Sequence, residues 1–562
     1  MMRRFLRAAL VPLGFATLLH AAPMLRLATT TVVPIPLPAG ANGGTQIVEA
    51  YNAGDGSLSL SGNPTSSVSW IATSYGASRA CTTTTASTTC IPIQLALNTS
   101  TLAASPIPYT GTVTVNGAAG VVDAPQTITV TVRIGALNVY VAPGATSDVS
   151  FNTSSPLTGS ASTQDGNRWL SLYAAGSFRF AYPYSVHVAP PASMAQGTYN
   201  GSLITSGSSF TPDNQTIPVT MRITTQPIAQ AYPAQATARL AQGAAPLAMQ
   251  ISLHNLGQGS LSFGTVSATT SDGGTWLTAS ANAGGWAALT LDAGTLAPGF
   301  YTGSVSIGSN AVNGTVTAPV SFQVVAKGAP LANYMGVVDN AIFGSGDAVA
   351  RGDIVDVFGE QFWFGNIAFS PGVPLATQIT ASGSTSSVLV NGLAAPLYFS
   401  SYSQIAFQVP VETALGTAQV QVQRDGIGGN IITVQVVDRA PRILIIKKQD
   451  GNVPDSAHAA QVGDVLTIWA IGLGATNPAV GTNVPAPGSE PLARLITMPA
   501  VEFGSGFFGS VSVTPAFAGL SPGSVGLYQV NAAIPQGLPS GLVNVTLMFA
   551  DGVSNTVQVA VQ

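Results

Sequence analysis

The sequence predicts an all-β protein built from tandem immunoglobulin-like β-sandwich domains. Three observations lead to this prediction: the length of the chain, its composition and a set of internal repeats. At 562 residues the chain is too long for one hydrophobic core. It contains 61 Gly and 38 Pro, which mark turns, while its polar positions are mostly Ser, Thr, Asn and Gln. Many turns and few helix-forming residues favour short strands.

The first 22 residues have the organisation of a secretion signal. Arginines near the start supply positive charge, residues 8–19 form an apolar run, and Ala22 offers a small residue for cleavage. No other segment reaches the roughly 18 apolar residues that a spanning helix needs. We therefore expect a secreted or cell-surface protein without a membrane span in its mature chain.

One pattern occurs three times between residues 23 and 327. An Asn-x-Gly-x-Gly-Ser-Leu-Ser phrase follows an alternating stretch at Asn52 and again at Asn255. Each copy closes on a segment such as TITVTVRI (127–134), whose apolar residues recur at every second position, as in a half-buried antiparallel strand. A Trp followed by Leu or Ile and a later Tyr-x-Gly step mark each copy, at Trp70 and Tyr109, Trp169 and Tyr199, and Trp276 and Tyr301.

A second pattern fills the rest of the chain and occurs twice. A Gly-Asp turn before an apolar strand appears at Gly352-Asp353 and at Gly463-Asp464. A later phrase, QIAFQVP (404–410), has its counterpart in LYQVNAAIP (527–535). The two copies predict two further sandwiches of a different kind.

These phrases resemble two known groups of domains. The Asn-Gly-Ser-Leu turn, the Trp-Leu/Ile pair and the G-x-Y-x-G hairpin resemble the BACON-like family of bacterial immunoglobulin-like domains. NGLAAPLYFSSYSQIAFQVP (391–410) and AGLSPGSVGLYQVNAAIP (518–535) resemble an uncharacterised C-terminal domain family of secreted acidobacterial proteins, which is similar to IPT/TIG modules. The resemblance implies architecture and export but no activity. The expected organisation is a signal peptide (1–22), three BACON-like repeats (23–134, 135–226, 227–327) and two IPT/TIG-like domains (328–437, 438–562).

The charge content restricts the possible partners. Charged residues make up 7% of the chain, against roughly 25% in an ordinary soluble domain, and the net charge is −4. Because no basic stripe is available to neutralise phosphates, nucleic-acid binding is excluded. An unidentified surface protein or glycan remains as the expected partner.

Candidate catalytic groups are sparse. His187, His254 and His458 fall in three different predicted domains, so they are not expected to form a triad or a metal cluster. Residues 519–523 match the G-x-S-x-G elbow, but Pro522 has no N–H to donate to an oxyanion. We therefore expect no enzyme activity, no catalytic or metal-binding residues and no cofactor, while a structural Ca²⁺ between domains stays open.

The two cysteines, Cys81 and Cys90, lie in one Thr-rich stretch. In an exported protein two such neighbouring thiols pair more often than they stay free, which predicts a local disulfide. A zinc site is the alternative, but two thiolates without neighbouring histidines do not complete its shell.

An aromatic run, Phe362, Trp363 and Phe364, follows a predicted strand. Successive strand residues point to opposite faces, so at least one ring is expected to meet solvent unless another domain covers it. Two functions follow: a structural or adhesive interaction module, or a carbohydrate-binding protein that uses this run as an exposed aromatic loop. The alternative is that this aromatic run fills the joint between two domains.

Overall fold

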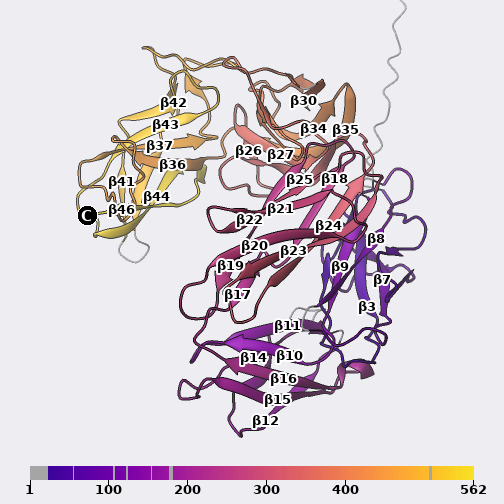
Figure 1. Cartoon of the computed structure of the whole chain (residues 1–562). Coiled ribbons are helices and arrows are strands. Elements are labelled where there is room, and N and C mark those ends of the chain that lie inside the picture. The colour runs from indigo at the N-terminus through magenta and orange to yellow at the C-terminus, as the bar shows by residue number, and fades with distance from the viewer. Residues whose placement is uncertain are drawn as a thin grey trace, which may run out of the picture.

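The computed structural model gives the fold of nearly the whole chain after residue 22 (Figure 1). The predicted secretion signal at residues 1–22 lies outside the described residues. The structure describes residues 23–54, 56–105, 108–121, 124–153, 155–175, 182–381, 383–504 and 509–562.

The described strands form ten sheets, which pair into five successive sandwiches. Sandwich 1 has the sheet β1(Leu25–Leu27)-β3(Gln46–Asn52)-β7(Thr89–Leu97)-β5(Ile71–Tyr75), with β6(Arg79–Ala80) beside β7, and the sheet β2(Thr31–Val32)-β9(Gln126–Val132)-β8(Tyr109–Val115)-β4(Thr65–Ser66). Sandwich 2 has β10(Leu137–Val141)-β16(Thr216–Ile223)-β15(Gly197–Ser206)-β12(Thr158–Thr163) and β11(Ser147–Thr153)-β14(Tyr182–Val188)-β13(Leu170–Ala174), plus the short helix η1(Thr211–Asp213). Sandwich 3 has β17(Ala229–Tyr232)-β19(Leu247–Asn255)-β22(Trp286–Leu291)-β21(Leu277–Asn282) and β18(Ala236–Ala241)-β24(Val316–Val325)-β23(Gly299–Ser309)-β20(Phe263–Thr270).

The last two sandwiches have larger sheets. Sandwich 4 has β25(Leu331–Asp339)-β27(Ile354–Glu360)-β33(Gln404–Gln408)-β32(Leu397–Ser400)-β28(Ala368–Phe369) and β26(Val349–Ala350)-β35(Ile427–Val437)-β34(Gly416–Arg424)-β30(Ser384–Val390)-β29(Ile379–Ala381), with β31(Leu393–Ala394) beside β30. Sandwich 5 has β36(Arg442–Lys448)-β37(Val465–Ile471)-β43(Tyr528–Ala533)-β42(Phe517–Leu520)-β39(Arg494–Leu495)-β38(Thr476–Asn477) and β41(Ser510–Val513)-β40(Ala500–Gly504)-β44(Gly541–Phe549)-β45(Gly552–Val553), with β46(Val557–Val561) beside β44. The predicted all-β fold of tandem immunoglobulin-like sandwiches is confirmed.

The repeated phrases of the first three sandwiches correspond to repeated packing devices. Asn52 begins the turn after β3, where its Oδ1 accepts from Met24 N (2.9 Å) and Gly54 N (3.0 Å). Asn255 has the same role after β19, accepting from Ile228 N (3.1 Å) and Gly257 N (2.9 Å). The Asn side chain thus fixes the turn and ties it to the first strand of its own sandwich. The repeated rings are placed alike. Trp70, Trp169 and Trp276 are buried. Tyr109, Tyr199 and Tyr301 each donate a hydroxyl hydrogen bond to a backbone carbonyl, of Ala103, Ala195 and Ala297 respectively.

The hydrophobic cores follow from strand alternation. In β16 and β34 every second residue is buried, as expected for sheets with one face on the core. Sandwiches 3, 4 and 5 each have their own core. One continuous cluster of buried apolar side chains instead runs through sandwiches 1 and 2. At this joint the Phe210 ring lies so close to Gly44 that a Cβ there would be 1.7 Å from it.

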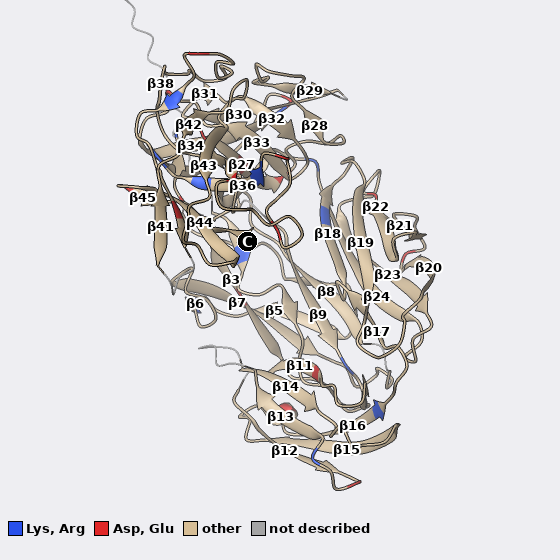
Figure 2. Cartoon of the chain, turned by 90° about the vertical axis from the view of Figure 1, so that its left-hand side faces the viewer, with Lys and Arg blue, Asp and Glu red and all other residues tan. Residues whose placement is uncertain are grey.

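Sandwiches that are distant in sequence lie side by side. β8 and β9 of sandwich 1 lie along β24 of sandwich 3 in both views, and Thr127 Oγ1 donates to Gln323 Oε1 (3.1 Å) across this contact (Figures 1 and 2). Figure 2 also shows how few charged residues the strands carry. Within the described ranges, no helix is long and apolar enough to cross a bilayer.

The disulfide region forms an ordered loop beside β3. Cys81 and Cys90 are joined by a disulfide with a Cα–Cα distance of 4.9 Å. The fully buried Glu49 carboxylate accepts from the backbone N and hydroxyl of Thr83, at 2.7 Å and 2.6 Å, and it pairs with Arg79 at 2.6 Å. Burial alone raises the pKa of Glu49, but the hydrogen bonds from Thr83 and Thr82 outweigh it, so the pKa is lowered.

Candidate functional site

Three sandwiches meet at one junction, where they share an ionic cluster. Arg239 of β18 donates to Glu360 at the end of β27, with 2.9 Å between Nη1 and Oε1. Arg26 of β1 adds a favourable charge interaction with Glu360. Burial raises the pKa of Glu360, and the two arginines oppose that rise. Sandwiches 1, 3 and 4 are thereby joined through one half-buried carboxylate.

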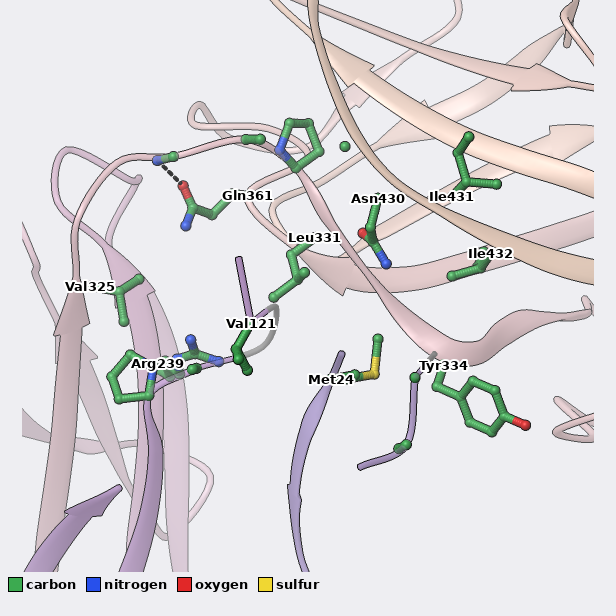
Figure 3. A pocket seen from close by; sticks show the side chains of 18 of the residues that line it. Met24, Val121, Arg239, Val325, Leu331, Tyr334, Gln361, Asn430, Ile431 and Ile432 are labelled. Carbon is green, nitrogen blue, oxygen red and sulfur yellow. Dashed lines mark hydrogen bonds between the residues drawn. The ribbon is translucent and has the colours of Figure 1, made fainter. Parts of the chain in front are cut away.

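A cleft of about 1310 Å³ opens at this junction. Small-molecule pockets usually have ~300–1,000 Å³, so this space is large. Figure 3 shows Met24 and Val121 of sandwich 1 facing the same space as Leu331, Asn430 and Ile432 of sandwich 4. Sandwich 3 contributes the end of β24 and the chain that leads into sandwich 4. The described lining contains no His, Cys, Ser or Lys.

The link between sandwiches 3 and 4 is held by a buried arginine. Arg424 is 1% exposed, its Nη2 donates to Gly328 O (2.6 Å), and its Nη1 donates to Gln361 O. The guanidinium also lies over the Phe364 ring, 4.4 Å from the centroid, and Lys327 approaches the same ring at 4.8 Å. The linker is therefore fixed by directed contacts rather than left as a free tether.

Amide side chains line the cleft, and most have partners. Asn430 spans both backbone groups of Ala332, with N···Oδ1 2.7 Å and Nδ2···O 2.9 Å. Gln361 accepts from Gly328 N at 2.8 Å. Gln323, 6% exposed, has its Oε1 engaged by Thr127, while its Nε2 has no hydrogen-bond partner among the described residues. This donor is therefore a buried amide group without the partner that such groups usually have.

The predicted aromatic run is not an exposed platform. Phe362 and Trp363 are both 0% exposed and belong to the core of sandwich 4, where Trp363 Nε1 donates to Asn366 O (2.8 Å). Phe364 is half-buried in the joint, and its carbonyl accepts from Ala245 N of sandwich 3 (2.8 Å). The expectation of an exposed loop is wrong because Gln361 adopts φ 61°, which ends the strand and breaks its alternation. Phe364 instead lies where the alternative interpretation expects it, in the joint between two domains.

A carboxylate, an imidazole and a hydroxyl lie in one cross-strand row of sandwich 2. His187 of β14 is paired with Asp148 of β11 on one side and with Ser171 of β13 on the other. His187 Nδ1 is 2.9 Å from Asp148 Oδ1, and the Tyr173 hydroxyl donates to the same oxygen (2.8 Å). No hydrogen bond joins Ser171 to His187 among the described atoms, so the geometry of an activated nucleophile is not formed there.

Acidic side chains are buried in the region where sandwich 4 meets sandwich 5. Asp353 is 0% exposed and accepts from Ala350 N (3.2 Å) and Ile354 N (2.9 Å). Burial raises the pKa of Asp353 to about 7. Arg442 of β36 pairs with Asp339 at 3.6 Å and with Asp347 at 3.0 Å across the joint. Within the described residues, no group of three or more His, Cys, Asp or Glu side chains could hold a metal ion.

Sequence reasoning missed the junction altogether. Its lining runs from Met24 to Gln435, so no local phrase marks it. One signal was present: β35 contains the pair Gly428-Gly429, and glycine inside a strand often marks a close approach of another backbone. Gly429 does lie against Pro330, whose carbonyl oxygen would be 2.4 Å from an added Cβ.

Comparisons with known proteins give structural likeness only. No family model matches the chain, and no curated protein matches it. Solved structures similar to it include an endo-fucoidan hydrolase from glycoside hydrolase family 107 (11% identity, 54% of this chain, 44% of that chain, TM-score 0.15). Another is a titin I-band fragment, with 8% identity over 54% of this chain and 99% of that chain and a TM-score of 0.13. A third is the human desmocollin-1 ectodomain, with 9% identity over 84% of this chain and 88% of that chain and a TM-score of 0.15. The chain spans less than half the length of the fucoidan hydrolase. Similarities with such TM-scores carry no argument about activity or partners.

Proposed function

We propose that this chain is an exported, non-catalytic scaffold that acts as a structural or adhesive interaction module at the cell surface. The observation that carries the proposal is the junction, where Arg239, Glu360 and Arg26 hold three sandwiches around one cleft. A fixed arrangement of domains offers a partner a preformed surface, which lowers the ordering cost of binding. The amino-terminal signal pattern and the resemblance to BACON-like and IPT/TIG-like secreted domains support export.

The character of the cleft supports binding rather than chemistry. Its described lining combines amides, apolar side chains and two ionic groups, Arg239 and Asp347, that are each already paired. Nucleophilic catalysis needs a nucleophile beside a base, and the lining offers no such pair. Such a surface is suited to holding an uncharged partner.

Glycan binding was favoured by the expected exposure of an aromatic loop, and that support is lost. Phe362 and Trp363 are core residues, so their faces are unavailable to a sugar ring. We therefore propose the interaction module alone.

The experiment is a retention assay on intact cells. Fluorescent protein comprising residues 23–562 is incubated with producing cells, and saturable binding that unlabelled protein competes is expected. Glu360→Ala, which opens the junction pair, is expected to reduce retention several-fold. Glu490→Ala, which removes an exposed pair with Arg494 (2.8 Å) in sandwich 5, serves as the control. Absence of saturable binding, or turnover of a polysaccharide or ester by the purified protein, would contradict the proposal.

A further inference from the structure

One sheet face of sandwich 3 is open to solvent and carries no charge. Because β24 of the other sheet meets sandwich 1 through Gln323, the outer face of the β17-β19-β22-β21 sheet points away from sandwich 1 (Figure 1). Outward side chains on this face, such as those of Gln230, Gln250 and Thr290, are exposed. The four strands contain no Asp, Glu, Lys or Arg. The face is therefore built from amide, hydroxyl and aromatic groups.

Two aromatic side chains lie in one cross-strand row of this face. Tyr232 of β17 is paired with Ser252 of β19, which is in turn paired with Trp286 of β22. Directly paired residues share a face of the sheet, so both rings point outward on either side of Ser252. Two strand spacings, about 10 Å, separate the backbones of Tyr232 and Trp286.

Both rings are held in place by their neighbours. Tyr232, which is 65% exposed, stacks on His254 with ring centroids 5.0 Å apart and an interplanar angle of 18°. The Trp286 indole lies against Gly284 in the turn between β21 and β22, where an added Cβ would be 1.8 Å from the ring. Asn282 fixes this turn by accepting from Gly284 N (2.8 Å). Rings that are already ordered lose little conformational freedom when a ligand binds.

The corresponding faces of sandwiches 1 and 2 are built differently. Counting back from the repeated Asn, Glu49 of sandwich 1 stands where Ser252 stands in sandwich 3. The disulfide loop covers Glu49, which is 0% exposed and accepts from the backbone N and hydroxyl of Thr83. In sandwich 2 the face carries the charged Asp148, bound to His187. Of these three related faces, that of sandwich 3 is the one that is both uncovered and uncharged.

The chemistry of the face matches a neutral polysaccharide. Sugar rings present C–H groups on their flat faces and hydroxyl groups around their rims. Aromatic rings pack against the C–H groups, while the amides of Gln230 and Gln250 both donate to and accept from hydroxyls. Two ordered rings in one row also match a chain that repeats a ring. A protein partner would favour one contiguous apolar patch, whereas here Ser252 separates the two rings.

We propose that this face of sandwich 3 binds a neutral polysaccharide chain, which stacks on Tyr232 and Trp286. The exposed amides of Gln230 and Gln250 bond to its hydroxyl groups. The site is separate from the aromatic run at residues 362–364, whose buried rings belong to sandwich 4 and its joint. The inference rests on the interaction role proposed above and names the class of partner for it.

The test is affinity electrophoresis of the purified protein in gels that contain hydroxyethylcellulose, xylan, galactomannan, starch or dextran. Polygalacturonate is the charged comparison. Retardation by at least one neutral polysaccharide, and none by polygalacturonate, is expected for wild type. Tyr232→Ala and Trp286→Ala are each expected to weaken this binding at least about 10-fold, since each removes a stacking surface. Phe369→Ala, which removes a ring of the same 65% exposure from sandwich 4, is the matched control and is expected to bind as wild type does.

A readout on the wild-type protein removes any dependence on variant folding. Trp286 and Trp469 are half-buried, while the other tryptophans are buried, so N-bromosuccinimide is expected to oxidise these two indoles first. The retarding polysaccharide is expected to protect Trp286 and to leave Trp469 reactive, as read by peptide mass spectrometry.

Three results would overturn the inference. These are retardation by none of the neutral polysaccharides, binding by Tyr232→Ala and Trp286→Ala as tight as that of wild type, and oxidation of Trp286 that the polysaccharide does not slow. The measurements use purified polysaccharides and no cells, and the variants leave the junction pair of Arg239 and Glu360 intact. A failure here is therefore separable from a failure of the retention assay.

Discussion

A glycine allows the repeated packing of tryptophan in sandwiches 2 and 3. A Cβ added to Gly201 would lie 3.1 Å from the Trp169 ring, and one added to Gly303 would lie 3.3 Å from the Trp276 ring. At Gly303 the backbone oxygen of Thr269 would be only 2.5 Å away. The Tyr-x-Gly step therefore meets a packing requirement. The tyrosine hydroxyl binds a backbone carbonyl just before the strand, and the glycine leaves room for the indole ring.

Trp363→Ala tests the core assignment of the aromatic run. Because the side chain is 0% exposed, we expect a loss of about 3–5 kcal/mol in the unfolding free energy of sandwich 4. Urea denaturation of both proteins measures the loss. Phe369→Ala is the control, since that ring is 65% exposed and its removal is expected to cost less than about 1 kcal/mol. Equal stability of Trp363→Ala and wild type would show that the Trp363 side chain is not part of the core.

Asp353 makes stability fall as pH rises through the acid range. Its carboxyl ionises at 3.8 in the unfolded chain, but burial raises its folded-state pKa to about 7. Between these pH values the folded state binds the extra proton, so its stability decreases as pH increases. Asp353→Asn mimics the protonated form and should remove this contribution. Melting temperatures from pH 4 to pH 8 test this: wild type should lose stability relative to the variant as pH rises. A constant difference would contradict the assignment.

At the scale of the elements, local phrases predicted much of what the structure contains. The alternation in residues 127–134 and the turn phrases after Asn52 and Asn255 correspond to β9 and to the ends of β3 and β19. The exposure of residues 362–364 was misjudged, because strand alternation was extended past Glu360, where the left-handed Gln361 ends it. A single φ angle of this kind has no marker in a sequence when the residue is not glycine.

Arg424→Ala tests how firmly the element linking sandwiches 3 and 4 is held. Removing the guanidinium leaves the carbonyls of Gln361 and Gly328 without their donor, at about 1–3 kcal/mol each. Local opening of the linker should then accelerate tryptic cleavage after the exposed Lys327. The rate is measured by limited proteolysis and mass spectrometry. Arg494→Ala, whose side chain is 47% exposed, is the control, and unchanged cleavage in Arg424→Ala would show that the linker is held by other contacts.

At the scale of the whole molecule, the arrangement of the sandwiches is what sequence patterns could not provide. Repeats predicted five domains in a row, but the chain folds back so that sandwich 1 lies against sandwich 3. The cleft depends on this return, because Met24 and Asn430 line the same space. Contacts between residues hundreds of positions apart leave no periodic trace in a single sequence.

The shared core of sandwiches 1 and 2 predicts joint unfolding. Val113 and Val186 are both 0% exposed and belong to one continuous cluster. Replacing either by Ala should cost about 2 kcal/mol and lower the same calorimetric transition by about 4–8 °C. Val305→Ala in the separate core of sandwich 3 should shift a different transition. If Val113→Ala and Val186→Ala moved separate transitions, the first two sandwiches would be independent units.

The return of the chain onto itself also sets an order of events during synthesis. Thr127 meets Gln323 only after 196 further residues have been added, and β35, which lines the cleft, is made later still. Synthesis from the amino terminus therefore produces sandwich 1 long before its neighbour in sandwich 3 exists. The lining of the cleft is complete only once β35 has been made, so Met24 and Val121 of sandwich 1 lack their facing residues until then.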